Sequence, residues 1–296
     1  MTAGDRSLEI VIVSYRCCDL LVACLRSIAE HPYTAGRLTV TVIDNASADG
    51  TAEAVREQFG TVSFTELPSN AGFSAANNIA LWATTAEQIL LLNPDTEVRE
   101  GVLDAMTAFL REHPRAGVAG CRLVRRDGSF DHAAKRSIPT VADALRYFGP
   151  GDGRASGSAY LAPHVDEHGI GAVDAVNGAF MLVRREAMAQ VGLLDPGFFM
   201  YGEDLDWCTR FRRAGWDVLY NGTVTMLHVK GATAGTHRRL RQNAAFHQSM
   251  GRFYRRHLGG DHVLLDGAVY AGIGAKLTLS VCRSALARAR RRLPRR

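Results

Sequence analysis

LEIVIVSY, at residues 8–15, is a short and almost continuously apolar run rich in β-branched residues. This composition predicts a strand that is buried on both faces of a sheet. Residues 19–31 follow with apolar side chains at helical spacing, and LTVTVIDN at residues 38–45 repeats the strand pattern. Buried strands that alternate with helices predict an α/β fold with a parallel, doubly wound sheet.

The alternation continues beyond the second strand. We expect helices at residues 51–59, 74–83, 102–113 and from about 202 onward, and strands at 62–67, 88–93, 118–123, 173–183 and 218–227. Asn177 and Gly178 interrupt the strand at 173–183, where a ligand or another backbone could approach closely. Residues 125–171 are polar and rich in Gly, Ser, His and Pro, so we expect a lid, a binding loop or partial disorder there.

Three of the predicted strands end in polar side chains. The three ends read Ser14-Tyr15, Asp44-Asn45 and Asn93-Pro94-Asp95. In open α/β sheets ligands bind beyond the carboxyl ends of the strands, so these side chains are expected to converge on one site. Neither a GxGxxG loop nor a GxxxxGK[ST] loop is present, which argues against a dinucleotide-dependent dehydrogenase. A nucleotide would be held by side chains and a metal, and Asp95 is a candidate ligand for Mg²⁺ or Mn²⁺.

A second informative stretch is DPGFFMYGEDLDWCTRFRRAG at residues 195–215. Two adjacent carboxylates, Glu203 and Asp204, follow an aromatic run and open a predicted helix that carries Trp207. The 3.6-residue repeat places the two acids on neighbouring stripes of that helix, so they need not share one role. Acids also stabilise the first turn of a helix, which leaves a structural and a catalytic interpretation open. Cys208 is expected to pack there rather than to act as a nucleophile.

The composition is that of a globular protein with ordinary thiols. Apolar residues make up 47% of the chain, which is ample for a core. The six cysteines are scattered without a CxxC pair, which argues against a zinc site and a disulfide framework. The first 15 residues lack the pattern of a secretory signal, so we expect a cytoplasmic location.

The charge is distributed unevenly along the chain. Residues 237–296 carry 14 Lys and Arg against 2 Asp and Glu, a net charge of +12, whereas residues 1–236 carry 21 against 28, a net charge of −7. We therefore predict a body at residues 1–236 and a basic, helical tail at 237–296. Asp266, Lys276 and Arg283 interrupt the apolar segment at 262–288. Because a central charge costs a spanning helix about 2.5 to 3.5 kcal/mol, we do not expect a transmembrane segment.

The tail is predicted to lie on an anionic membrane, at the inner face of the plasma membrane. Lys276, Arg283 and Arg290 would form a polar stripe, opposite an apolar face that includes Leu265, Val269, Leu279 and Leu286. With the arginine cluster at 288–296, this pattern is typical of a helix that binds a membrane surface. A homodimer interface is the alternative. Nucleic acid is not an expected partner because the tail has few aromatic residues.

Seven motifs follow one another in order: VSY at 13–15, DNASADGT at 44–51, NAGFSAANN at 70–78, LLNPDT at 91–96, NGAFMLVRRE at 177–186, VGLLDPGFFMYGEDLDWCTRFRRAGW at 191–216, and His228. As a set, covering residues 10–236, they resemble the inverting family 2 glycosyltransferases of the GT-A fold, and their rhamnosyltransferase branch in particular. The resemblance implies a Rossmann-like, mostly parallel sheet, with a nucleotide-binding half at 1–100 and an acceptor and catalytic half at 101–236. It also implies dTDP-rhamnose as donor and a polyprenyl-diphosphate-linked sugar, with N-acetylglucosamine favoured, as acceptor.

The resemblance assigns the donor site by position. The nucleotide sugar would lie among Ser14, Tyr15, Asp44, Asn45, Asn70, Gly72, Asn77, Asn93 and Asp95. Asp95 matches the last aspartate of the family's DxD motif and would hold the divalent cation together with His228. Asn93 and Pro94 stand where many relatives have a second acid, so fewer charges hold the cation.

The resemblance also assigns the catalytic and acceptor groups. Asp204 matches the general base, with Glu203 in a supporting role, and the acceptor would contact Asn177, Gly178, Phe199, Tyr201 and Trp207. A positioned carboxylate that takes the proton of the acceptor hydroxyl contributes about 10² to 10⁴ in rate. Core packing is the alternative for the aromatic residues. A catalytically silent nucleotide-sugar-binding or membrane scaffold protein, or a family 2 transferase with another donor, is the alternative for the whole chain.

Overall fold

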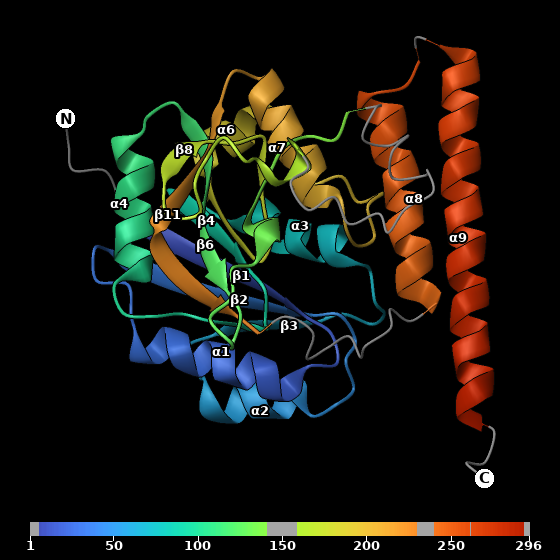
Figure 1. Ribbon diagram of the computed structural model, residues 1–296. Coiled ribbons are helices and arrows are strands. Elements are labelled where there is room, and N and C mark those ends of the chain that lie inside the picture. Colours follow the sequence, from blue (N-terminus) through green and yellow to red (C-terminus); the bar gives the residue numbers. More distant parts are fainter. Residues whose placement is uncertain (1–5, 141–158, 230–239, 261, 293–296) are drawn as a thin grey trace.

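The computed structural model describes residues 6–140, 159–229, 240–260 and 262–292, and predictions for other residues lie outside it (Figure 1). The strands are β1 Ser7–Ser14, β2 Arg37–Asp44, β3 Ser63–Glu66, β4 Gln88–Leu92, β5 Thr96–Glu97, β6 Ala116–Val124, β7 Lys135–Arg136, β8 Ile170–Ala172, β9 Ala175–Val176, β10 Phe180–Arg184 and β11 Asp217–His228. The α-helices are α1 Cys18–Glu30, α2 Thr51–Gln58, α3 Phe73–Ala83, α4 Val102–Glu112, α6 Arg185–Val191, α7 Glu203–Arg213, α8 Leu240–His257 and α9 Val263–Arg292. Two 3₁₀ turns, η1 His132–Ala134 and η2 Ala159–Leu161, lie in the stretch that the sequence predicts to be irregular.

Within the described residues, nine strands form the main sheet, in the order β3-β2-β1-β4-β10-β6-β11-β5 with β8 paired to β11. The sheet is mostly parallel, as expected, and β3, β2, β1 and β4 form its parallel half. The predicted doubly wound pattern fails at β10, which runs antiparallel to both β4 and β6. The physical reason is its point of entry: Phe180 pairs with Leu92, so β10 starts at the carboxyl end of β4 and runs backward without a helical crossover.

The predicted interruption at Asn177 and Gly178 is confirmed. The segment divides there into β9, which pairs with β7 in a separate two-stranded sheet, and β10 of the main sheet. Asn93 N donates a hydrogen bond to Ala179 O (3.1 Å), so the turn lies beside the end of β4. The irregular turn is thereby placed at the ligand-binding edge of the sheet.

The core lies on both faces of the main sheet. All eight residues of β1 are buried, as expected for a parallel strand that helices cover on two sides. In Figure 1, α1 and α2 lie on one side of the strands, and α3, α6 and α7 lie on the other. Among the largest fully buried side chains are Trp207 and Phe211 of α7 and Tyr220 of β11. The helix that carries the two predicted catalytic acids is therefore anchored in the core.

The helices α8 and α9 form an antiparallel pair at one side of the molecule, with α9 outermost (Figure 1). α8 contributes Phe253 to the main core, and its Tyr254 forms a smaller core with Val269 and Ile273 of α9. The predicted apolar face of α9 is consequently divided, since Val269 is buried against α8 whereas Leu279 is 47% exposed. The other predicted positions on this helix after residue 282, Arg283, Leu286 and Arg290, lie outside the described side chains.

The first turns of α9 expose apolar side chains. Val263 and Leu264 are 85% and 91% exposed. By length and composition, Val263–Cys282 is the one helical segment in the described part of the chain that could cross a membrane, and 11% of its apolar window is buried. Asp266 and Lys276 lie within it. That these charges prevent a membrane span stays a prediction.

Candidate active site

The carboxyl end of β2 is shaped by its own polar side chains. The Asp44 carboxylate is buried and accepts hydrogen bonds from Ser47 N (2.8 Å) and Ser47 Oγ (2.5 Å). The neighbouring Asn45 is also buried, and its Nδ2 donates to Gly72 O (3.2 Å) while its Oδ1 accepts from Ala71 N (3.0 Å). Both side chains thus hold the turn and join it to the loop at residues 70–72. Direct contact of Asp44 with a nucleotide stays a prediction.

The end of β1 lies beside that turn. Ser14 is buried, pairs in register with Asp44, and has its hydroxyl 3.4 Å from Cys17 Sγ. Tyr15 is 38% exposed, and the guanidinium of Arg16 lies 5.3 Å from the centroid of its ring. An exposed ring beside a cation is a surface on which a nucleobase can stack. The structure therefore brings the predicted residues of the first two strand ends together.

The loop at residues 70–73 contacts Phe199, one of the predicted acceptor contacts. Asn70 Oδ1 accepts from Gly72 N (2.9 Å), and Phe73 N donates to Phe199 O (2.7 Å). Gly72 has φ +86°, and a Cβ there would lie 2.7 Å from the Phe199 ring. Only glycine adopts this backbone and permits this approach without strain. Asn77, buried one turn later, donates to Phe73 O (2.9 Å) and so supports the start of α3.

Asp95 and His228 lie side by side, although 133 residues separate them in sequence, because β11 pairs with β5 directly after Asp95. Nε2 of His228 is 3.4 Å from Asp95 Oδ1, and its Nδ1 is 3.0 Å from Asp131 Oδ2. Burial by itself lowers the pKa of His228, but the hydrogen bonds to the two carboxylates raise it to about 9. The imidazole is consequently positively charged at neutral pH when no cation replaces its proton.

These residues fit a weakly coordinated divalent cation. A carboxylate that fixes the second nitrogen of a metal-binding histidine is a common arrangement, and Asp131 supplies it here. Among the described residues, no group of three or more His, Cys, Asp or Glu side chains is arranged to hold a metal ion. Mg²⁺ and Mn²⁺ sites that share their ion with substrate phosphates need only one or two carboxylates from the protein. Asp95 and His228 would therefore hold a cation together with a diphosphate.

The predicted base, Asp204, is held by a buried ion pair. Arg136 of β7 donates from NH2 to Asp204 Oδ2 (2.5 Å), and the two side chains are 9% and 10% exposed. Gly178 N also donates to Asp204 Oδ2 (3.3 Å). Burial by itself lowers the pKa of Arg136, but Asp204 and Tyr160 raise it above its ordinary value. The guanidinium stays charged and orients the carboxylate on the first turn of α7.

Glu203 lies in a different environment from its neighbour. It is buried, and burial, with a further contribution from the charge of Asp204, raises its pKa to about 8. In the described structure, Glu203 Oε2 is buried without a hydrogen-bond partner. Burial thus favours the neutral form of Glu203, whereas Asp204 is paired with the guanidinium of Arg136. That the two acids have different roles stays a prediction.

Gly178 lies between Phe73, at the start of α3, and the predicted base Asp204. A Cβ at this position would lie 3.7 Å from the Phe73 ring and 3.9 Å from Asp204 Cβ. The preceding Asn177 caps the turn, because its Oδ1 accepts from Ala179 N (2.8 Å). The next peptide binds the backbone of Asn93, as described above. The ends of β4, α3 and α7 therefore meet around one glycine.

The three predicted acceptor aromatics have different surroundings. Phe199 is 44% exposed beside Gly72, and Tyr201 is half-buried with its ring 5.8 Å from that of Phe246 on α8. Trp207 is fully buried, and its Nε1 donates to Gly192 O (2.8 Å). The prediction that Trp207 stacks on a sugar is corrected by this burial, since no face of the ring is available. Phe199 and Tyr201 stay as predicted acceptor contacts.

The neighbouring thiol of Cys208 is fully buried in the core. Burial raises the pKa of Cys208 to about 12. A thiol with so high a pKa carries almost no thiolate at neutral pH. The packing role predicted for Cys208 is the one that its position supports.

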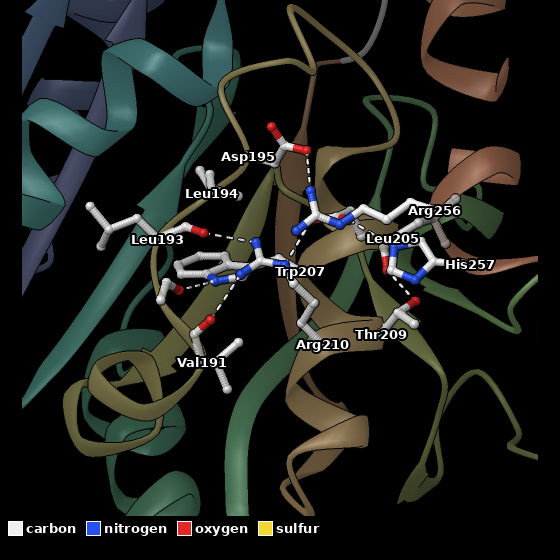
Figure 2. A network of polar contacts seen from close by, with 12 residues as sticks. Val191, Leu193, Leu194, Asp195, Leu205, Trp207, Thr209, Arg210, Arg256 and His257 are labelled. Atoms are coloured by element: carbon white, nitrogen blue, oxygen red, sulfur yellow. Dashed lines mark hydrogen bonds and ion pairs between the residues drawn. The ribbon is translucent and has the colours of Figure 1, made fainter. Parts of the chain in front are cut away.

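A polar network ties α7, the helix of the predicted base, to the tail (Figure 2). Asp206, fully buried two residues after the predicted base, binds Arg210 Nε (2.9 Å) of its own helix and His257 Nε2 (2.8 Å) of α8. Arg256 bridges from α8 to Asp206 (3.3 Å) and to Asp195. Burial by itself raises the pKa of Asp206, but its cationic partners on α7 and α8 lower it. The carboxylate is thus ionised and fully paired.

Several residues of this site were not identified from the sequence. Arg136 and Asp131 lie in the polar stretch at 125–171, and their partners are distant in the chain. The spacing of Arg256 and His257 gives no sign that they pair with Asp206. For Arg136 the only signal was indirect: a buried acid at Asp204 requires a cationic partner, but the sequence offers many arginines for that role.

Comparisons with known proteins agree with this geometry. The family model described as "Glycosyltransferase like family 2" matches residues 6–255. The N-acetylglucosaminyl-diphospho-decaprenol L-rhamnosyltransferase of Mycobacterium tuberculosis is 29% identical over 287 residues, which cover 93% of this chain and 91% of that protein. Rhamnosyltransferase WbbL of Escherichia coli (strain K12) is 28% identical over 165 residues, 53% of this chain and 60% of that protein.

The fold is also shared with a solved glycosyltransferase. The mannosyltransferase PcManGT from Pyrobaculum calidifontis, solved in complex with GDP-Man and Mn²⁺, matches with a TM-score of 0.59 and 19% identity. The match covers 99% of this chain and 77% of that one. The sheet described above, which is mostly parallel and flanked by helices, is accordingly a GT-A fold. The chain belongs to glycosyltransferase-like family 2.

Proposed function

We propose that this transferase moves L-rhamnose from dTDP-rhamnose to a sugar, N-acetylglucosamine being favoured, on a polyprenyl diphosphate, and inverts the anomeric centre. The observation that carries the proposal is the arrangement of Asp204 at the junction of the donor loop and the acceptor loop, held by Arg136 and Gly178. The similarity to two rhamnosyltransferases, one of them acting on N-acetylglucosaminyl-diphospho-decaprenol, supports this choice of substrates.

The carboxylate of Asp204 would accept the proton of the acceptor hydroxyl as that oxygen attacks the anomeric carbon. Because the attacking oxygen and the leaving diphosphate lie on opposite faces of the sugar, one base is sufficient and no covalent enzyme intermediate forms. The neutral Glu203 beside it adds no second negative charge at neutral pH. Phe199 would form one wall for the acceptor, because its exposed ring borders Gly72 of the donor loop.

A divalent cation, when bound, neutralises the negative charge that develops on the departing diphosphate. Asp95 and His228 would hold it, and Asp131 would keep the histidine in the required orientation. His228 would have to be neutral to hold a cation, so protonation of its ring, which the raised pKa of about 9 favours, would oppose that role in acid. Tyr15 and the turn after Asp44 would hold the nucleoside.

The test is donor-dependent release of dTDP in the presence and absence of Mg²⁺ or Mn²⁺, with the lipid-linked acceptor supplied. Asp204→Asn should abolish transfer and still bind dTDP-rhamnose in calorimetry. If Asp204→Asn transfers rhamnose at the wild-type rate, the assignment of the base is refuted. Nucleotide binding without turnover on any donor and acceptor pair would instead favour a binding or scaffold protein.

A further inference from the structure

A cavity of about 330 Å³ lies between α8, α9 and the loop at residues 195–202. It is lined by Gly197, Gln248, Gly251, Arg252, Arg255 and Tyr270. None of these residues is acidic, two are arginines, and Gln248 and Tyr270 add neutral hydrogen-bond donors. The lining is therefore chemically suited to an anion that accepts several hydrogen bonds.

We propose that this cavity binds the diphosphate of the lipid-linked acceptor. The inference rests on the proposed function for its choice of ligand, whereas the anion site itself rests on the structure. A diphosphate presents many acceptor oxygens, and arginine binds such groups with paired, charge-assisted hydrogen bonds.

The charge around the cavity favours such a ligand. The carboxylate of Asp195 binds one of the lining residues, since it accepts hydrogen bonds from Arg252 Nε (2.9 Å) and NH2 (2.8 Å). Arg256 pairs with the same carboxylate and with Asp206. The charges of Arg252 and Arg256 are thus matched by two carboxylates, and Arg255 adds a further positive charge at the cavity wall. The surplus matches an anionic ligand in sign.

Two glycines border the cavity. A Cβ on Gly197 would overlap Cζ of Arg252, so a side chain there would displace this guanidinium from the loop. On α8, a Cβ on Gly251 would make ordinary contact with the Tyr270 ring at 3.9 Å. The cavity wall therefore has no side chain at these two positions.

The cavity is held at a fixed place relative to the predicted base. Ser249 Oγ of α8 donates to Met200 O (3.0 Å) in the loop that leads to Asp204. On the other side, His257 and Arg256 bind Asp206 of the catalytic helix, as Figure 2 shows. The wall of the cavity and the base therefore belong to one connected set of contacts.

The location agrees with the chemistry of the acceptor. The diphosphate connects the lipid chain to the sugar, so it must lie between the membrane and the base. Tyr270 of α9 forms one wall of the cavity, and the same helix exposes Val263 and Leu264, which we propose to face the membrane. The opposite wall, at Gly197, begins the loop that carries the predicted acceptor contacts. The cavity thus lies between the two parts that the acceptor must reach.

The first test compares Arg255→Gln with Arg26→Gln in the full-length chain. Arg26 is an exposed arginine on α1, remote in the fold from α8 and α9, and serves as the matched control. With N-acetylglucosamine linked through diphosphate to a short polyprenyl chain, in neutral detergent, Arg255→Gln should raise the acceptor KM about tenfold to a hundredfold. The KM for the nucleotide sugar should stay within about twofold, because the cavity lies on the acceptor side. An acceptor KM equal to that of Arg26→Gln would overturn the proposal.

The second test measures binding without turnover, so that it does not depend on the choice of donor. Phosphatidylcholine vesicles that contain either polyprenyl diphosphate or phosphatidylglycerol are sedimented with wild-type and variant protein. The proposal is supported if Arg255→Gln loses binding to the vesicles that contain polyprenyl diphosphate but not to those that contain phosphatidylglycerol. Equal loss on both kinds of vesicle would reassign the cavity to membrane headgroups and refute the acceptor role. If no donor is turned over but the diphosphate-specific loss is seen, the proposed function fails and the anion site stands.

Discussion

Replacement of Arg136 by methionine should destabilise the protein strongly, because it leaves Asp204 buried without its counter-charge. The two side chains are 9% and 10% exposed and are joined by a hydrogen bond of 2.5 Å. Removal of one member of such a buried pair costs about 3 to 5 kcal/mol. Since a domain of ordinary stability unfolds at a cost of about 5 to 15 kcal/mol, Arg136→Met should fold and be measurable.

Urea denaturation of Arg136→Met, Asp204→Asn and the double variant would measure the coupling. The double variant removes both charges, so it should be more stable than the sum of the single losses predicts, by about 2 kcal/mol or more. Arg212→Met is the control, because Arg212 pairs with Asp174 (2.7 Å) at half-exposed positions. Its loss should lie within about 0 to 1 kcal/mol. If Arg136→Met and Asp204→Asn each lose as little unfolding free energy as the control, and the two losses add in the double variant, the stabilising ion pair is refuted.

Three further predictions concern the donor loop, the second acid and the tail. Burial and the charge of Asp204 raise the pKa of Glu203 from 4.5 to about 8. The folded state therefore binds this proton more tightly than the unfolded state does. The free energy of unfolding should fall as the pH rises from about 4.5 to about 8, because the carboxyl ionises. The free energies of unfolding of Glu203→Gln and of the wild type would be measured in urea at about pH 5 and about pH 9. The difference between them should change in favour of Glu203→Gln at the higher pH, and a difference that does not depend on pH would contradict the raised pKa. Gly72 has φ +86°, and a Cβ there would lie 2.7 Å from Phe199. Gly72→Ala should therefore lower the free energy of unfolding by about 1 to 3 kcal/mol and weaken donor binding. Gly60→Ala serves as control, because a Cβ at Gly60 meets no atom within 4 Å. If the tail lies on the membrane surface without crossing it, alkaline carbonate should release the full-length protein from membranes, and retention there would favour a spanning Val263–Cys282 segment.

The regular parts of the fold could be predicted because they depend on local patterns. The apolar runs predicted the strands of the parallel half, and their polar ends located the edge at which the site forms. The direction of β10 could not be predicted, because residues 180–184 are as apolar as a parallel strand and only the pairing of Phe180 with Leu92 fixes their direction. Direction is a property of the connection and is absent from the composition of a strand.

Candidate site residues could be located in the sequence where one motif supplies them, but their surroundings could not be predicted where burial decides. The Glu203-Asp204 pair could be located in sequence, but its asymmetry comes from the burial of Glu203 and from the pairing of Asp204 with Arg136, 68 residues earlier. Trp207 belongs to an aromatic cluster that suits a sugar as well as a core. Its role depends on the carbonyl of Gly192 and on complete burial, neither of which a local pattern contains.

The antiparallel strand β10 has a consequence for how the chain folds during synthesis. β4 pairs with β1 on one side, but its other neighbour is β10, which leaves the ribosome only after residues 93–179 have been made. Until then β4 is an apolar edge strand with unpaired backbone groups, and such edges promote association with other chains. An N-terminal fragment that ends before residue 180 should therefore aggregate, although it contains all of the parallel half. The parallel half, which we propose to bind the nucleotide, thus depends on a strand made late in synthesis to cover its edge.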